Sequence, residues 1–252
     1  MSVHTLEAMG TMVSLRLPDD AHTPEDTARA VSDVQQIFDE RDKRFSLYRP
    51  ESEASLIARG ERQLTDASIE MRDAYAESLG WRDATGGAFT PHRPDGTLDL
   101  SGTIKADAIR VAAQSLRSHG FTVFSLNAGG DLCTAGVPED GAWVTGIADS
   151  HTPGKVLSIV SLTPSMSCMA TSGTAERGEH IWRRPETDRS FAQATVCAPD
   201  IMTADVLATA IIAGGNDALN IATARGDVGV LVVKADGSLL ANDLFRELVT
   251  VS

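Results

Sequence analysis

Asp205 and Thr209 place a carboxylate and a hydroxyl four residues apart in the segment that reads MTADVLAT, residues 202–209. If a helix begins there with Thr203 as its N-cap, the two side chains lie on one helix face, one turn apart. Their oxygens are hard donors of the kind that Mg²⁺ binds, with phosphate oxygens and water completing its shell. The structural alternative is that Asp205 favours the positive start of the helix and that Thr209 bonds back to a main-chain carbonyl.

A second candidate segment is DLSGTIK, residues 99–105, where small residues lead into an expected helix. A helix start offers free N–H groups to an anion. We expect Lys105 in the first turn, where a positive charge is unfavourable with the helix dipole. We therefore predict that Lys105 meets a phosphate, the alternative being a solvated surface lysine. Neither the P-loop pattern GxxxxGK[ST] nor the GxGxxG pattern occurs.

Two further clusters of small residues could contact a ligand. In NAGGD, residues 127–131, paired glycines follow an expected strand, so the backbone can approach a ligand closely or form a plain tight turn. In residues 171–173, TSG, hydroxyl and amide groups could bind a polar ligand, although loops are rich in such residues. His180 follows and is either a general base or a solvated loop histidine.

The charge balance narrows the class of partner. The chain has 252 residues, with 35 acidic and 22 basic side chains and a net charge of -13. Binding to a phosphate backbone relies on clustered Lys and Arg, whereas the basic residues of this chain are scattered. We therefore expect neither nucleic acid nor an anionic membrane surface as a partner. A bound phosphate ligand then needs local neutralisation by N–H groups, a lysine or a metal ion.

The three cysteines, Cys133, Cys168 and Cys197, have no CxxC spacing, which argues against a disulfide framework and a zinc site. The N-terminal residues lack a basic stretch followed by an apolar region, so we expect no signal peptide. No run of apolar residues approaches the length that spans a bilayer, so we expect no transmembrane segment. The chain is expected to be cytoplasmic, or else the trimmed form of an exported protein.

Hydrophobic periodicity predicts the elements that position these residues. One helix, capped by Thr23 and Pro24, is expected over residues 24–44, and a second over 65–79, with Ile69, Met71, Tyr75 and Leu79 inward and Gly80 stopping it. A third follows DLSGTIK and ends at Gly120, a fourth runs from Thr203 to Gly214-Gly215, and a fifth covers 218–224.

Strands are expected at residues 13–17, 121–126, 143–147, 156–162, 194–197, 228–233 and 239–240, and Asp236-Gly237 signals a hairpin. Residues 175–190 are the least ordered candidate. Helices and strands intermix without a regular βαβ alternation. The pattern therefore predicts an α+β fold, one domain over residues 1–252, with a mixed or antiparallel sheet and flanking helices.

The motifs described above, together with several others, occur along nearly the whole chain in the order that is typical of one known family. Together, Met9-Gly10-Thr11, Phe45-Ser46-Leu47-Tyr48 with Ser52-Glu53, Gly86-Gly87-Ala88-Phe89, DLSGTIK, NAGGD, ATSG, His180-Ile181 and ADVLAT resemble the ApbE family, the FAD:protein FMN transferases. The resemblance implies that family's α+β fold, in which FAD lies in a cleft and its pyrophosphate meets Mg²⁺.

The same resemblance implies a role for individual positions of this chain. Met9, Tyr48, Ala88, Phe89 and Thr90 would line the flavin dinucleotide, Asp99 and Lys105 match the pair that contacts FAD, and His180 matches the candidate base. Gly102 through its carbonyl, Asp205 and Thr209 match the metal positions, with Ala208 beside them. The expected cofactor-binding set also includes Asn127, Gly129, Gly130, Ser172, Gly173 and Ile181.

Several positions depart from the family pattern. Arg183 stands where an aspartate follows the His-Ile pair, and Ala58 stands where an asparagine is expected. Ala106 follows the lysine in place of glycine, Thr90 stands in place of an aspartate, and Arg110 occupies a position where aspartate is common. These changes concern the acceptor and adenine sides more than the metal positions.

The resemblance implies that FMN is cleaved from FAD and joined by a phosphoester bond to a threonine of an acceptor flavoprotein, with AMP released. Mg²⁺ held by Asp205 and Thr209 would bridge the pyrophosphate, with support from Lys105. His180 would take the proton from the attacking threonine. The alternatives are FAD hydrolysis to FMN and AMP, a non-catalytic module that stores or delivers FAD, and a scaffold that retains only the fold.

Overall fold

The computed structural model describes residues 1–19, 22–149, 152, 154–173 and 190–250. Its centre is an eight-stranded sheet in the order β1-β2-β3-β4-β7-β8-β9-β10, in which every pair of neighbours is antiparallel. The strands are β1 (Ser2–Ala8), β2 (Thr11–Leu17), β3 (Phe124–Ala128), β4 (Asp131–Ala135), β7 (Cys168–Gly173), β8 (Phe191–Ala198), β9 (Gly229–Lys234) and β10 (Leu239–Ala241). The expected α+β fold with a mixed or antiparallel sheet is confirmed as an antiparallel one.

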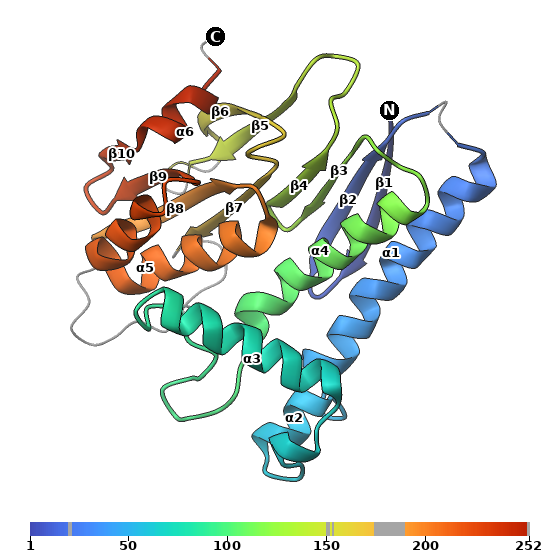
Figure 1. Cartoon of the computed structure of the whole chain (residues 1–252), viewed down its shortest axis with the longest axis vertical. Coiled ribbons are helices and arrows are strands. Elements are labelled where there is room, and N and C mark those ends of the chain that lie inside the picture. The colour runs from blue at the N-terminus through green and yellow to red at the C-terminus, as the bar shows by residue number, and fades with distance from the viewer. Residues whose placement is uncertain (20–21, 150–151, 153, 174–189, 251–252) are drawn as a thin grey trace.

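Three long helices cover one face of this sheet: α1 (Pro24–Phe45), α4 (Ser101–Ser118) and α5 (Ile201–Ala224). They lie side by side in Figure 1, with α4 in the middle. The hydroxyl of Thr23 caps α1 as expected, by accepting a hydrogen bond from the Asp26 N–H at 3.1 Å. Val34 and Phe38 are fully buried against the sheet, and each such side chain contributes about 1.5–3 kcal/mol.

The opposite face of the sheet has its own cover. The strands β5 (Trp143–Ala148) and β6 (Val156–Leu162) form a separate two-stranded antiparallel sheet, and the short helix α6 (Asp243–Leu248) contacts both β6 and β9. Trp143, Val160 and Phe245 are buried there with Met169 of β7. The main sheet is therefore buried on both faces over its central strands.

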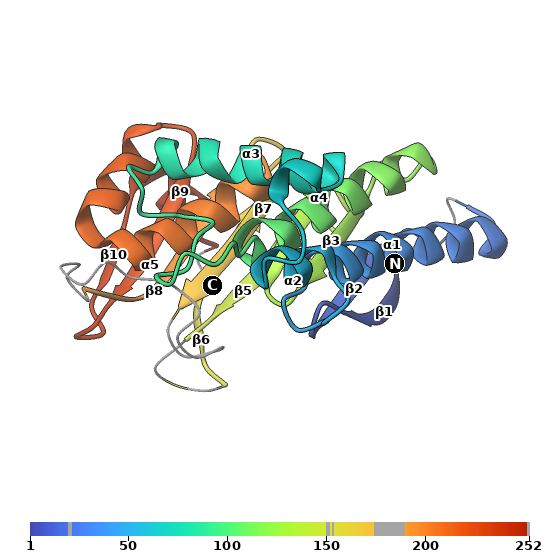
Figure 2. The ribbon, with the colours of Figure 1, turned by 90° about the horizontal axis from the view of Figure 1, so that it is seen from below.

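A third apolar cluster joins the remaining helices to the fold. The helix α2 (Glu53–Ala58), the 3-10 turn η1 (Leu64–Asp66) and α3 (Ile69–Ala84) surround it, with Phe45, Met71 and Ile104 in its interior. A hydrogen bond of 2.9 Å between the hydroxyls of Ser78 and Thr103 fixes α3 to the start of α4. Figure 2 shows these helices against α1 and α4.

The structure corrects several expected boundaries. The helix α3 begins four residues later than predicted and continues through Gly80, and Ile69 is 62% exposed rather than inward. The strand β3 begins at Phe124 instead of Phe121. Elements that periodicity did not predict are β1, β4, β7, α2 and α6. The hairpin at Asp236-Gly237 is confirmed by the pairing of β9 with β10.

The helix α5 corrects two further expectations. It contains a break at Gly215, whose φ is 63°, which confirms two helical segments, but the first begins at Ile201 rather than after Thr203. By length and hydropathy alone α5 is long and apolar enough to cross a membrane, contrary to the expectation that no segment would be. However, 61% of its most apolar stretch is buried inside the fold. Its packing against β7 and β8 accounts for that composition, since a core helix is apolar on most sides.

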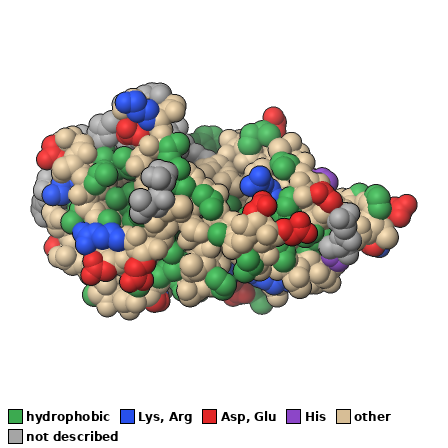
Figure 3. Space-filling view, turned by 90° about the horizontal axis from the view of Figure 1, so that it is seen from above, with side chains coloured by type: hydrophobic (Ala, Val, Ile, Leu, Met, Phe, Trp, Pro, Cys, Tyr) green, Lys and Arg blue, Asp and Glu red, His purple; other side chains and the backbone are tan. Residues whose placement is uncertain are grey.

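Acidic and basic side chains are intermingled over the described part of the face in Figure 3. On this face the basic residues are scattered, as they are along the sequence.

Candidate functional site

Two tight turns mark one end of the sheet. Met9-Gly10 joins β1 to β2 with φ of 50° and 69°, and Gly129-Gly130 joins β3 to β4 with φ of 60° and 95°. Both are two-residue hairpins of the kind that needs positive φ at each central residue. The Gly129 N–H donates to the Met12 carbonyl at 3.1 Å, so the two turns lie together.

Met9 is the one residue other than glycine with positive φ in the described part of the chain. A side chain in this region of backbone space costs roughly 1 kcal/mol or more and persists only when its surroundings fix it. Met9 packs against the core under the helices and against the cluster around α3, which fixes it. The expected flavin-lining residue is therefore a strained position at the boundary of two clusters.

The start of β4 meets α4 through an ion pair. Lys105 lies in the second turn of α4, not in the first turn as predicted, because α4 begins at Ser101. Its ammonium contacts the carboxylate of Asp131, whose side chain is 1% exposed. Asp131 ends the NAGGD motif, but sequence reasoning gave it no role. The pair holds the lysine next to the Gly129-Gly130 turn.

Ala88 and Phe89 pack closely against α5 and α4, respectively. A Cβ on Gly102 would lie 2.8 Å from Cε2 of Phe89, and a Cβ on Gly214 would lie 2.6 Å from the Cβ of Ala88. Both distances are shorter than a packed core allows, so glycine is required for this approach. The structure therefore brings Gly102, the expected metal carbonyl, beside the expected flavin-lining residues.

On α5, Asp205 and Thr209 keep the spacing of one turn that the sequence predicted. The N-cap is Asp200, not Thr203, because the carboxylate of Asp200 accepts a hydrogen bond from the Thr203 N–H at 2.9 Å. Asp205 is therefore beyond the first turn, where the helix dipole gives little stabilisation to a carboxylate. Asp205 is nevertheless only 6% exposed, and a buried carboxylate requires a partner or a counter-charge.

The end of β7 reaches the same face of α5. The hydroxyls of Ser172 and Thr209 are 3.1 Å apart and share a hydrogen bond, while Ala208, one residue before Thr209, is fully buried. Because Leu132 pairs with Met169 across β4 and β7, Ser172 and Gly173 lie at the same end of the sheet as the Gly129-Gly130 turn. Residues from α4, α5, β7 and two hairpins thus converge there.

Asp99 has a partner that sequence reasoning missed. The guanidinium of Arg93 donates to Oδ2 of Asp99 at 2.8 Å, and Oδ1 accepts from the Ser101 N–H at 3.0 Å. Asp99 therefore ties the loop of residues 91–99 to the start of α4. An antiparallel bridge between His92 and Leu98 closes this loop into a hairpin. The hairpin places the pair of Arg93 and Asp99 just before the start of α4.

Other predicted residues differ in their settings. Tyr48, expected to line the dinucleotide, is 84% exposed in the turn between α1 and α2. The side-chain oxygen of Asn127 accepts a hydrogen bond from the Gly130 N–H at 3.2 Å, so it stabilises the turn. Thr90 Oγ1 accepts from the His92 N–H at 3.3 Å. His180 and Ile181 lie outside the described residues.

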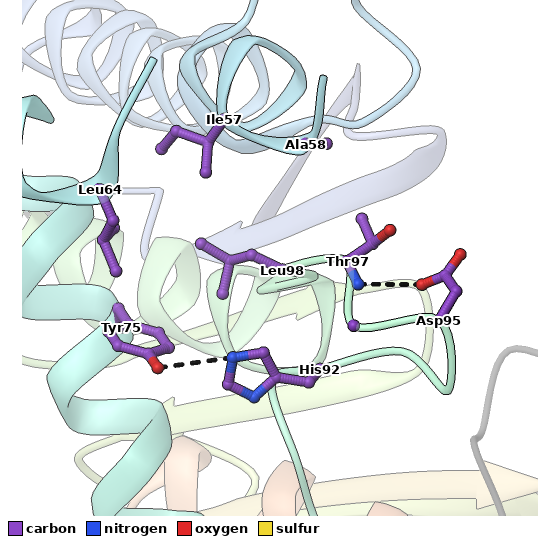
Figure 4. Close-up of a pocket in the computed structure, with 9 residues that line it drawn as sticks. Ile57, Ala58, Leu64, Tyr75, His92, Asp95, Thr97 and Leu98 are labelled. Carbon is purple, nitrogen blue, oxygen red and sulfur yellow. Dashed lines mark hydrogen bonds between the residues drawn. The ribbon is translucent and has the colours of Figure 1, made fainter. Parts of the chain in front are cut away.

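A cavity of about 310 Å³ lies between α2, α3 and the loop of residues 91–99 (Figure 4). The Tyr75 hydroxyl and Nε2 of His92 lie 3.4 Å apart in its wall, and Asp95 Oδ1 accepts from the Thr97 N–H at 2.9 Å. Its other lining residues are Ile57, Ala58, Leu64, Gly96 and Leu98. Sequence reasoning assigned Tyr75 only to the core. The cavity combines an apolar wall with a polar end formed by the 91–99 loop.

The solved structures that share this fold include three ApbE proteins, each at low sequence identity. A flavin transferase ApbE from Vibrio cholerae has a TM-score of 0.76 and 20% identity, with 98% of each chain covered. The ApbE protein from Thermotoga maritima has a TM-score of 0.80 and 18% identity over 99% of this chain and all of that one. The flavinyl transferase ApbE from Pseudomonas stutzeri has a TM-score of 0.77 and 18% identity, covering 99% of this chain and 97% of that one.

Among curated proteins, no sequence matches this chain. The model of the ApbE family, in contrast, matches residues 91–232, more than half of the sequence. This match includes the DLSGTIK, NAGGD and ADVLAT segments that converge at one end of the sheet. The chain belongs to the ApbE family.

Proposed function

We propose that this protein is an Mg²⁺-dependent FAD:protein FMN transferase, which moves FMN from FAD to a threonine of an acceptor flavoprotein and releases AMP. The observation that carries the proposal is the hydroxyl of Thr209, which lies 3.1 Å from that of Ser172 at the end of β7. The same end of the sheet holds the pair of Lys105 and Asp131, and Asp205 lies one turn before Thr209 on α5. Two of the structural relatives are named as flavin or flavinyl transferases, which supports the same activity.

The donor set fits Mg²⁺ better than a metal held by protein alone. The described residues contain no group of three or more His, Cys, Asp or Glu side chains that could hold a metal ion. One carboxylate, one hydroxyl and one main-chain carbonyl, from Asp205, Thr209 and Gly102, would leave several positions for phosphate oxygens and water. Mg²⁺ commonly binds in this way, with few protein ligands. Bound there, the ion would neutralise charge on the diphosphate.

Lys105 would supply the second positive charge. The buried carboxylate of Asp131 restricts the position of its ammonium, so little reorganisation would be needed when phosphate oxygens arrive. The Lys105 side chain keeps 19% of its surface exposed, which leaves a route for contact with a ligand. In a chain with a net charge of -13, such local neutralisation is needed for a dinucleotide to bind.

In the transfer, the hydroxyl oxygen of the acceptor threonine forms a bond to the FMN phosphorus. The bond between that phosphorus and the bridging oxygen breaks, and the bridging oxygen leaves with AMP. The threonine proton must pass to a base, and His180 remains the candidate, outside the described residues.

The test is AMP release from FAD and Mg²⁺, with and without a threonine-bearing acceptor domain, followed by flavin fluorescence on a denaturing gel. We expect fluorescent acceptor in the wild type and none in Asp205→Asn. Asp217→Asn is the matched control, because Asp217 is an exposed carboxylate on the same helix. AMP release at the parental rate in Asp205→Asn would overturn the assignment. AMP release without labelled acceptor would instead favour the hydrolase alternative.

A further inference from the structure

Two of the three cysteines face each other across adjacent strands. Cys133 of β4 and Cys168 of β7 are direct partners in the antiparallel ladder. Both side chains belong to the core under the helices, whereas Cys197 of β8 belongs to the core on the opposite face of the sheet. Cys197 pairs with Met169, the residue after Cys168. Because successive side chains of a strand point to opposite faces of the sheet, the Cys197 thiol lies on the other face from the Cys133 and Cys168 thiols.

The hydrogen bonds around this pair set its spacing. The Thr134 N–H donates to the Ser167 carbonyl at 2.8 Å, and these residues flank Cys133 and Cys168. A flanking bond of this kind makes the cysteines a non-hydrogen-bonded pair, whose Cα atoms lie about 4.5 Å apart. Disulfides span Cα separations of about 4.4–6.8 Å. The register thus permits a disulfide without separating the strands.

The two thiols also interact. A hydrogen bond from the Cys168 thiol lowers the pKa of the Cys133 thiol below its ordinary value, and the same bond raises the pKa of Cys168. Burial alone raises the pKa of Cys197 to about 12. Because the thiolate is the reactive form, Cys133 is the best nucleophile of the three.

We propose that Cys133 and Cys168 form an intramolecular disulfide when the protein meets hydrogen peroxide. The Cys133 thiolate attacks one peroxide oxygen and becomes a sulfenic acid, while the other oxygen leaves as hydroxide and is protonated to water. The Cys168 sulfur then attacks the sulfenic sulfur and forms the S–S bond. The expelled hydroxide takes the Cys168 proton. Two thiols and one peroxide give one disulfide and two waters.

The pair is closed to large oxidants but not far from solvent. Cys133 is 6% exposed and Cys168 2%, whereas Cys197 has no exposed surface, so a reagent as small as peroxide is required. The bond would connect β4, which begins with Asp131, to β7, which carries Ser172. Both strands lead to the candidate site, and the inference does not depend on what that site does.

The experiment exposes the full chain to hydrogen peroxide, blocks free thiols under denaturing conditions and digests without reductant for mass spectrometry. We expect the three free thiols to fall to one, Cys197, and a linked pair of peptides containing Cys133 and Cys168. Disulfide formation lowers the mass of the chain by two hydrogen atoms, and reduction with dithiothreitol should restore that mass.

Cys197→Ser is expected to keep the link, and Cys133→Ser and Cys168→Ser to lose it. A parallel oxidation in urea gives the distribution of links in the unfolded chain. The proposal is overturned if the folded protein retains three free thiols, or stops at the sulfenic acid or higher oxides. It is equally overturned if the folded protein joins Cys197 to either partner as often as the unfolded chain does.

Discussion

The ammonium of Lys105 on α4 lies against the carboxylate of Asp131, the first residue of β4. In the described part of the chain no other donor reaches the Asp131 oxygens, and their burial makes a partner necessary. The hairpin turn at Gly129-Gly130 carries the carboxylate and the second turn of α4 carries the lysine. The pair therefore fixes the helix on the strand end where the other candidate residues converge.

Asp131→Asn should destabilise the protein, because it removes the buried carboxylate that is paired with the largely buried Lys105 ammonium. Breaking a buried pair by removing one partner costs about 3–5 kcal/mol, and the remaining exposure of Lys105 puts the expected loss at the lower end. Urea unfolding measures this difference. The double variant Lys105→Met/Asp131→Asn should lose less than the two single losses added together. Additive losses would show that the two groups do not stabilise each other.

Arg110 explains one departure from the family pattern. Its guanidinium donates to both carboxylate oxygens of Glu77 on α3, at 2.7 and 2.9 Å, and to Asp107 at 2.7 Å. Its hydrogen bond to Glu77 raises the pKa of Arg110 above its ordinary value. An arginine at this position therefore joins α3 to α4.

Arg110→Asp should lower the free energy of unfolding by about 1 kcal/mol at low salt, since partly exposed pairs are worth little individually but three carboxylates would then meet. Raising the salt concentration should shrink the loss by screening the repulsion. Arg110→Gln, which keeps a donor without charge, is the control and should show a weaker salt dependence. Equal stability of Arg110→Asp and the wild type at low salt would contradict this account.

The sequence could predict the long helices because their signals are local. The cap at Thr23 and the apolar spacing from Val34 to Phe38 depend on residues within a few turns. The predicted start of α5 was wrong because Asp200 and Thr203 are both good N-cap residues. The choice between them depends on the direction in which the chain leaves β8. The strand β7 was missed because CMATSG has no clear alternation, and its neighbours on β4 and β8 decide its conformation.

The same distinction applies to the candidate site. The spacing of Asp205 and Thr209 is local to one helix, so it could be read without tertiary structure. The partnership of Lys105 with Asp131, and that of Asp99 with Arg93, depends on how hairpins dock on α4. Only the assembled sheet shows that Ser172 meets Thr209, because β7 and α5 are separated by a further strand in the sequence.

Two helical glycines should respond oppositely to alanine. Gly80 lies exposed inside α3 with no atom within 4 Å of an added Cβ, so Gly80→Ala should stabilise the protein by about 0.5–1 kcal/mol. Gly102→Ala should destabilise it, because the Phe89 ring must move away from the new methyl group. Thermal unfolding compares the two variants. Phe89→Leu should restore part of the loss in the Gly102→Ala background, and a stabilised Gly102→Ala variant would refute the packing argument.

Variants of Thr209 and Ser172 can show whether the Thr209 hydroxyl binds the metal or only makes a structural hydrogen bond. Thr209→Val and Ser172→Ala each remove the same 3.1 Å contact, but only Thr209→Val removes a donor assigned to Mg²⁺. Thr209→Val should therefore need a higher Mg²⁺ concentration for half-maximal AMP release. Ser172→Ala should keep the Mg²⁺ requirement of the wild type, whatever its effect on FAD affinity, because the Thr209 hydroxyl remains.

Calorimetric titration of Mg²⁺ in the presence of ADP, which carries a diphosphate but cannot donate FMN, gives the same comparison without turnover. Weaker Mg²⁺ binding in Thr209→Val alone is the expected result. If both variants shift the Mg²⁺ dependence equally, the hydroxyls act as a pair that holds β7 on α5, and Thr209 is not a ligand. Because valine matches threonine in shape and Thr209 is only partly buried, a loss of fold is not expected to obscure the difference.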